Sequence, residues 1–142
     1  KSEAQSSKFK RKNPKHKAQN RIMEEKRKYD LDERTLKFLK NVIVFLRSLH
    51  KDFVNGELGR QLIRSSGSVG ANYREANEAV SKKDFAFRIR ICRKEAKESY
   101  FWLSSYDCGG ELEEKRKALL QEALELSKIF GSMVKKLEEN GF

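Results

Sequence analysis

Apolar residues recur at helical spacing in four successive segments, and this periodicity limits the fold of the chain more than any other feature. The clearest series comprises Leu62, Val69, Tyr73, Ala76 and Val80, separated by steps of seven, four, three and four residues. Such steps place side chains along one side of a helix that packs against others. Because the chain has one proline and 37% charged residues, long solvated helices are favoured over sheets. The sequence predicts an all-α, up-down-up-down antiparallel four-helix bundle.

The predicted helices are bounded by capping and turn residues. In chain order they cover about residues 35–49, 57–81, 85–103 and 111–137, with Asn55-Gly56 as the turn before the second. The residues that can cap the first helix are Asp30 or Asp32, and those that can cap the third are Ser81 or Asp84. We expect the inner face of the first helix to consist of Leu36, Leu39, Val42 or Ile43, Leu46 and Leu49.

A basic tail, residues 1–28, precedes the bundle, residues 29–142. The tail has eleven Lys and Arg against three Glu, a net charge of +8 out of +11 for the whole chain. It has too few apolar side chains to offset the entropy of ordering, so we expect at least residues 1–20 to be disordered alone, or the tail to be partly helical. Met23 is a plausible translation start, which makes residues 1–22 an upstream extension or a gene-model artefact.

Two groups of cations are the candidate nucleic-acid-binding residues. A dense basic arm can fold onto phosphates, although a merely solvated tail and an acidic protein partner are the alternatives. The arm comprises Lys8, Lys10, Arg11, Lys12, Lys15, Lys17 and Arg21. The second group shares one outward face of the third helix, where an ordinary solvated face is the alternative and Glu95 and Glu98 dilute the charge. It comprises Arg90, Arg93, Lys94 and Lys97.

The sequence shows no catalytic, metal-binding or membrane-spanning pattern. It lacks a nucleophile elbow, a phosphate-binding glycine loop and zinc-ligand spacing, and the serines near Gly67 have no neighbouring histidine. We therefore predict no enzyme activity, no cofactor, no metal and no small-molecule substrate. The longest apolar run, residues 42–46, is far shorter than a membrane span, and no secretory leader is visible. Two isolated cysteines favour the reducing cytoplasm.

A stripe of small and polar residues runs beside the apolar series of the second helix. Its members are Gln61, Ser65, Ser68, Asn72, Glu75 and Ala79. Small residues allow close backbone approach, so we interpret this stripe as an inter-helix or inter-subunit surface. Gly67 and Gly70 match the GxxG pattern of KH domains, but without the surrounding strands close helix packing is the better interpretation. We expect Glu75 and Glu98 to pair between helices with Arg64, Asn72 or Lys83.

Three segments in order resemble the small four-helix-bundle proteins of the 23S rRNA intervening-sequence family. They read YDLDERTLKF at residues 29–38, LIRSSGSVGANYREANEAVSKKDF at 62–85 and EAKESYFWL at 95–103. Members are encoded within inserts of bacterial ribosomal RNA genes or elsewhere in bacterial genomes, and have no firmly assigned activity. The resemblance implies a homopentameric bundle with suspected RNA binding and no catalysis.

The resemblance also supplies the candidate motif and interface residues. Carried over by position, the family's motif residues are Arg64, Ser65, Ser66, Asn72, Glu75, Ala76, Lys83, Asp84, Phe85 and Glu98. We add Ser68 from the polar stripe and Trp102 from the aromatic run Tyr100-Phe101-Trp102. Three consecutive side chains span about 200° of a helix, so at least one of these aromatics is expected to pack against a neighbouring subunit.

Two functional hypotheses follow. The first is a non-enzymatic, cytoplasmic, pentameric bundle that binds RNA through charge. The second is an oligomeric protein–protein adaptor, such as an accessory subunit of a nucleic-acid enzyme, with no direct nucleic-acid role. The family distantly resembles the pentameric accessory protein of diversity-generating retroelements, which works beside a reverse transcriptase and favours the second hypothesis.

Overall fold

The computed structural model describes residues 13–142, apart from the side chains of residues 27–29. The chain divides into two units, with the boundary between Asp30 and Leu31. In the first unit, residues 13–26 have exposed side chains. Four of the predicted tail cations, Lys8, Lys10, Arg11 and Lys12, lie outside the described residues.

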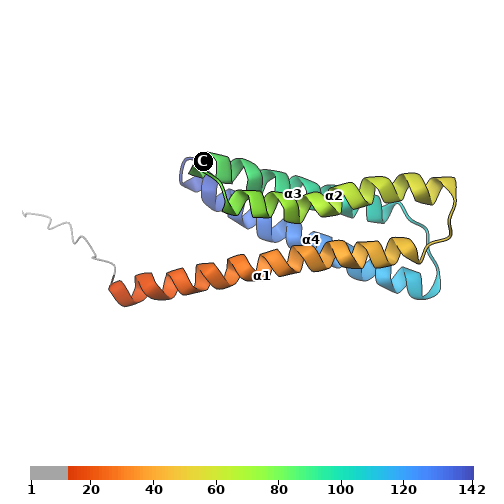
Figure 1. Cartoon of the computed structure of the whole chain (residues 1–142), viewed down its shortest axis with the longest axis horizontal. Helices are drawn as coiled ribbons and strands as arrows, with labels where there is room; N and C mark the ends of the chain where they lie inside the picture. Colours follow the sequence, from red (N-terminus) through yellow and green to blue (C-terminus); the bar gives the residue numbers. More distant parts are fainter. Residues whose placement is uncertain (1–12) are drawn as a thin grey trace, which may run out of the picture. The chain divides into compact units, whose positions relative to one another are not determined.

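Four helices account for nearly all of the described chain (Figure 1). They are α1 (Pro14–Arg47), α2 (Phe53–Asn77), α3 (Lys82–Ser104) and α4 (Gly110–Glu139). Within residues 31–142, consecutive helices run antiparallel and are joined by short connections, as Figure 1 shows. Contacts join each helix to the next, and the Arg34 guanidinium donates to the Glu122 carboxylate, which joins α1 to α4. The predicted all-α four-helix bundle is confirmed.

Helix α1 begins 21 residues before the predicted start at Thr35. Asn13 accepts a hydrogen bond from the Lys15 amide at 3.0 Å, and Pro14 suits the first helical position because its fixed φ is helical and it has no N–H to satisfy. Strong helix formers follow, with no further proline or glycine before Arg47. Of the two alternatives predicted for the tail, the structure therefore has the partly helical one, and residues 14–20 are helical rather than disordered. Asp30 and Asp32 lie inside the helix and cannot cap it.

The start of α2 also differs from the prediction. The Asp52 carboxylate accepts a hydrogen bond from the Asn55 amide at 2.8 Å, which caps the helix, and α2 then begins at Phe53. Asn55 and Gly56 are thus in the first turn of α2 and do not form the predicted turn. An aspartate cap satisfies an otherwise unpaired amide at the helix start, and this local gain fixes the boundary. Helix α3 begins at Lys82, three residues before the predicted start, because Ser81, one of the two predicted caps, accepts a hydrogen bond from the Asp84 amide at 3.1 Å.

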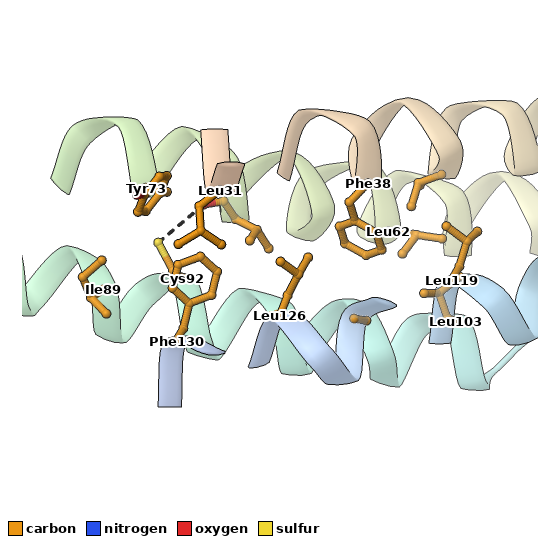
Figure 2. Packing of buried hydrophobic residues seen from close by; sticks show 14 of the residues in the cluster. Leu31, Phe38, Leu62, Tyr73, Ile89, Cys92, Leu103, Leu119, Leu126 and Phe130 are labelled. Carbon is orange, nitrogen blue, oxygen red and sulfur yellow. Dashed lines mark hydrogen bonds between the residues drawn. The ribbon is translucent and has the colours of Figure 1, made fainter. Parts of the chain in front are cut away.

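The core between the four helices is formed by large apolar side chains with almost no exposed surface. It includes Phe38, Val42, Phe45, Leu62, Val69, Ile89, Leu103, Leu126 and Phe130. Figure 2 shows Phe38, Leu62, Leu103 and Leu119 turned toward one another, with Phe130 beside Cys92. Such close-packed burial contributes about 1.5–3 kcal/mol for each large side chain before entropy is subtracted.

Two predicted core positions were wrong. Leu36 is 40% exposed, because the inward series of α1 is Leu31, Thr35, Phe38, Val42 and Phe45, with steps of four and three residues. Val80 is 95% exposed, because α2 ends at Asn77 and leaves Val80 in the connection to α3.

Glycines on one side of α2 let α1 lie close to it. A Cβ atom built on Gly70 would be 2.9 Å from the Thr35 hydroxyl oxygen, and one on Gly67 would be 3.8 Å from the Leu39 methyl groups. Gly59 faces Leu46 in the same way, at 3.4 Å. The interpretation of the GxxG pattern as close helix packing is confirmed.

Candidate nucleic-acid interface

Two of the predicted cations of α3, Arg90 and Arg93, contact α4 or the residues that follow it. The Arg93 side chain passes over Gly131, where a Cβ atom would be 3.8 Å from Arg93 Cδ. Arg90 donates to the backbone oxygen of Phe142 at 2.5 Å, and its guanidinium lies 3.7 Å from the Glu138 carboxylate. Lys94 and Lys97 are exposed. Arg90 is therefore partly neutralised, whereas Arg93 and Lys97 make no hydrogen bond or ion pair with any residue in the described range.

Two lysines of α4 join this group, and the sequence did not indicate them. Lys128 precedes Gly131 by three residues and Lys135 follows it by four, so both lie on the same side of α4 as Gly131. Both are exposed. Because Gly131 contacts Arg93, this side of α4 borders the cations of α3. We call the set Arg93, Lys94, Lys97, Lys128 and Lys135 the α3–α4 basic face. The only sequence feature that relates these two lysines is their seven-residue separation, which places them on the same side of a helix.

The acidic neighbours on α3 are directed away from the basic face. Arg64 of α2 lies 2.5 Å from the Glu98 carboxylate and 3.5 Å from that of Glu95. The expected pairing of Glu98 with Arg64 is confirmed, but Glu75 is exposed and its side chain makes no bond to a described residue. Arg64 therefore offsets part of the negative charge of both carboxylates, while Lys94 still interacts electrostatically with Glu95, as the expected dilution of the stripe implies.

The buried position of Glu95 shifts the pKa of its carboxyl group. Burial raises the pKa of Glu95, and the neighbouring Glu98 carboxylate raises it further, while Arg64 and Lys94 oppose the shift. Burial is the largest single influence on Glu98 and favours its neutral form, but hydrogen bonds with Arg64 and Glu95 and the charge of Arg64 together outweigh it and lower the pKa of Glu98. The pKa values of these two carboxyl groups, on successive turns of α3, are thus shifted in opposite directions.

The polar stripe of α2 is an inter-helix surface within the chain. The Ser99 hydroxyl of α3 donates to the Ser65 hydroxyl at 2.9 Å, and both side chains are fully buried. Arg88 donates to the Asn72 amide oxygen at 3.2 Å, and Asn72 in turn donates to Ser68. Short hydroxyl side chains permit this approach, and their mutual hydrogen bonds satisfy groups that would otherwise be buried unpaired.

The other motif residues lie near the start and the end of α3. Lys83 is exposed, and Phe85 packs against the core. The backbone amide of Asp84 donates to the Ser81 hydroxyl that caps the helix. At the other end, Phe101 is 62% exposed and Tyr100 41% exposed, while Trp102 is half-buried against the core.

A second exposed surface, which we call the α1–α2 apolar face, is formed by side chains of α1 and α2. Leu36, Leu39, Ile43 and Leu46 of α1 follow one another at steps of three and four residues. Leu36 and Ile63 of α2 are 40% and 48% exposed, whereas the other three side chains are partly buried. At one end this face opens into a groove of 440 Å³. The groove is lined by Leu46, Leu49, His50, Lys51, Asp52, Asn55, Gly56, Gly59, Arg60 and Ile63.

The remaining predicted cations, Lys15, Lys17 and Arg21, are exposed residues of the first unit of the chain.

Reactive groups are few in the described part of the chain. Burial raises the pKa of the Cys92 thiol to about 12, so it stays protonated at neutral pH and is a poor nucleophile. Across residues 13–142, no three His, Cys, Asp or Glu side chains gather in a group that could hold a metal ion. None of the helices in this range has an apolar stretch long enough to cross a membrane.

Comparison with known proteins places the chain in a family. The sequence pattern of the 23S rRNA-intervening sequence proteins matches residues 27–132. A solved structure, a protein of unknown function from the S23 ribosomal protein family of Bacteroides thetaiotaomicron, is similar with 30% sequence identity and a TM-score of 0.62. That similarity covers 74% of this chain and 98% of the other. No match was found among curated proteins. The chain therefore belongs to the 23S rRNA-intervening sequence protein family.

Proposed function

We propose that this protein is a non-catalytic, homopentameric helical bundle of the cytoplasm that binds RNA through the α3–α4 basic face. The observation that supports RNA binding is that two neighbouring helices contribute five cations to one side, where Arg93 packs over Gly131, and that Arg64 pairs with Glu95 and Glu98. Exposed cations without counter-charges attract phosphates, and binding then releases the ions condensed on the nucleic acid.

The strength of such binding depends on salt. If all five cations contact phosphates of single-stranded RNA, the slope of log K against log salt is about −3.5, from roughly −0.7 per contact. Affinity then falls roughly 100-fold between 50 and 200 mM salt. Little sequence preference is expected, because phosphate contacts do not distinguish bases.

Self-association is supported by a different surface. The family resemblance implies a pentamer, and the α1–α2 apolar face supplies exposed apolar side chains of the kind that subunits cover. Helices α1 and α2 are neighbours, as are α3 and α4, so within the bundle the apolar face and the basic face lie on opposite sides. Both surfaces can therefore be used at once, and several basic faces in one assembly bind a long RNA with increased avidity.

The experiment that tests RNA binding compares two charge reversals of equal size. The variant Lys97→Glu with Lys128→Glu changes the basic face, whereas Lys37→Glu with Lys40→Glu changes two exposed lysines of α1. Binding of a fluorescent RNA is measured by anisotropy at 50 mM salt. We expect at least a tenfold loss for the first variant and a much smaller loss for the second. Equal losses would show that net charge alone determines binding, and would contradict a defined face.

A further inference from the structure

Two exposed aromatic rings stand at the ends of a row of cations on α3. Phe87 is 58% exposed and Phe101 is 62% exposed. Between them lie Arg90, Lys94 and Lys97, so the row has steps of three, four, three and four residues. Residues at such steps are successive neighbours along one side of a helix. We call Phe87, Arg90, Lys94, Lys97 and Phe101 the α3 ridge.

Each ring is held in place by a neighbouring side chain. The Trp102 ring lies edge-on to Phe101, with 5.0 Å between centroids and 73° between planes. The Arg88 guanidinium lies 6.0 Å from the centroid of Phe87, and Asn72 fixes that guanidinium through a hydrogen bond. Rings fixed in this way lose little conformational freedom when a flat ligand stacks on them.

The spacing of the ridge suits a short piece of nucleic acid. Phe87 and Phe101 are 14 residues apart, which is about 21 Å along a helix that rises 1.5 Å per residue. At roughly 3.4 Å per stacked nucleotide, this distance corresponds to about six nucleotides. The cations between the rings match phosphates, and the rings match base faces.

We propose that the α3 ridge binds unpaired RNA, with bases stacked on Phe87 and Phe101 and the backbone along Lys94 and Lys97. Base faces are hidden in a duplex and free in a single strand, so aromatic platforms select single strands. This inference rests on the proposed RNA-binding function and adds the class of RNA that is bound. An RNA duplex, whose base faces are hidden, would contact the cations of the ridge but not stack on its aromatic rings.

The test compares two RNAs of equal length on the full chain at 50 mM salt. The probes are a fluorescein-labelled 12-nucleotide oligouridine and a labelled 12-base-pair RNA duplex. We expect Phe87→Ala and Phe101→Ala each to weaken oligouridine binding by roughly 5- to 150-fold, which corresponds to the loss of one base stacked on an aromatic ring. Duplex binding is expected to change less than twofold, and Phe101→Tyr to retain the wild-type affinity. Phe53→Ala is the matched control, since Phe53 is 81% exposed and lies on α2, away from the ridge.

The possible results separate the ridge from the RNA-binding function itself. Equal loss on both RNAs, or no loss on oligouridine, overturns the ridge proposal while RNA binding stands. A drop in the mass of Phe101→Ala by light scattering also overturns it, because the ring then belongs to a subunit contact. If the unmodified chain binds neither RNA, the proposed function fails together with the ridge.

Discussion

Small and hydroxyl-bearing side chains decide how closely α2 approaches its neighbours. Gly70 leaves room for Thr35, whose hydroxyl donates to the Leu31 carbonyl at 2.7 Å. Ser66 donates to the Leu62 carbonyl at the same distance, and Ser65 pairs with Ser99. Each of these buried hydroxyls has a partner, so the polar stripe costs little stability and permits short inter-helix distances.

A methyl group at Gly70 is expected to destabilise the bundle. The Cβ of Gly70→Ala would be 2.9 Å from the Thr35 hydroxyl oxygen and 3.2 Å from Thr35 Cβ. The resulting overpacking costs about 1–3 kcal/mol, which exceeds the gain of up to about 1 kcal/mol in helix propensity. Gly56→Ala is the matched control, because nothing lies within 4 Å of its Cβ. Urea unfolding should show a lower midpoint for the first variant and a higher one for the second. The reverse order would refute close packing at Gly70.

Neutralising Glu95 is expected to stabilise the protein at neutral pH. Its pKa is raised in the folded state, so its contribution to stability is present below the unfolded pKa and is lost as pH rises through the folded pKa. Glu95→Gln avoids this loss of stability at neutral pH, and the difference in stability between the variant and the unmodified chain should vanish near pH 4.

Glu98 has a lowered pKa in the folded state, so its contribution to stability is present above the unfolded pKa and is lost as pH falls through the folded pKa. Glu98→Gln should therefore destabilise the protein at pH 7. Urea unfolding midpoints of both variants, measured at pH 4 and pH 7, test the two predictions. If both substitutions moved the midpoint at pH 7 in the same direction, the predictions would be contradicted.

At the scale of single helices, α1 and α3 each have two functional sides. The inward side of α1 contains Phe38 and Phe45, whereas Leu36 and Ile43 lie on the α1–α2 apolar face. Helix α3 turns Ile89 and Leu103 into the core and exposes the α3 ridge. A helix with two such sides contributes to the fold with one and to recognition with the other.

Charge on the α1–α2 apolar face is expected to break the assembly without unfolding the subunit. Ile63→Lys places an ammonium group on a side chain that is already 48% exposed, so the subunit tolerates it while an apolar contact between subunits does not. Light scattering should give a mass near 16.6 kDa for the variant, against about five times that mass for the unmodified chain. Val44→Lys is the control, since Val44 is 53% exposed on another side of α1. Equal masses for the unmodified chain and Ile63→Lys would contradict this interface.

Over the whole molecule, charge is distributed very unevenly. Residues 1–28 have a net charge of +8, which leaves +3 for the bundle out of a total of +11. Within the bundle, ion pairs such as Arg34 with Glu122 and Arg64 with Glu98 neutralise other surfaces. The basic face therefore has a strong local charge although the net charge of the bundle is small.

Removal of residues 1–22 is expected to weaken RNA binding without abolishing it. The truncation removes eight cations and one acid, so the salt slope should become shallower by up to about 0.7 for each lost phosphate contact. The basic face remains, so measurable affinity should remain at 50 mM salt. Anisotropy across a salt series compares the full chain with the one that begins at Met23. Complete loss of binding would assign the RNA site to the tail.

The cations of the candidate site were predicted only in part. Arg93, Lys94 and Lys97 could be placed on one face because helical periodicity relates residues of the same helix. Lys128 and Lys135 could not be added, because the sequence does not state which side of α4 borders α3. The burial of Glu95 and its contact with Arg64 were missed for the same reason.

The sequence by itself determined the four helices, their antiparallel order and the membership of the family. These follow from local patterns, namely apolar periodicity, capping residues such as Ser81 and short connections. Only the tertiary structure decided which side of each helix is inside. It turned Phe38 inward and Leu36 outward, and it set Arg93 against Gly131. The physical reason is that the rotation of a helix about its axis is fixed by packing against distant residues, not by its own spacing.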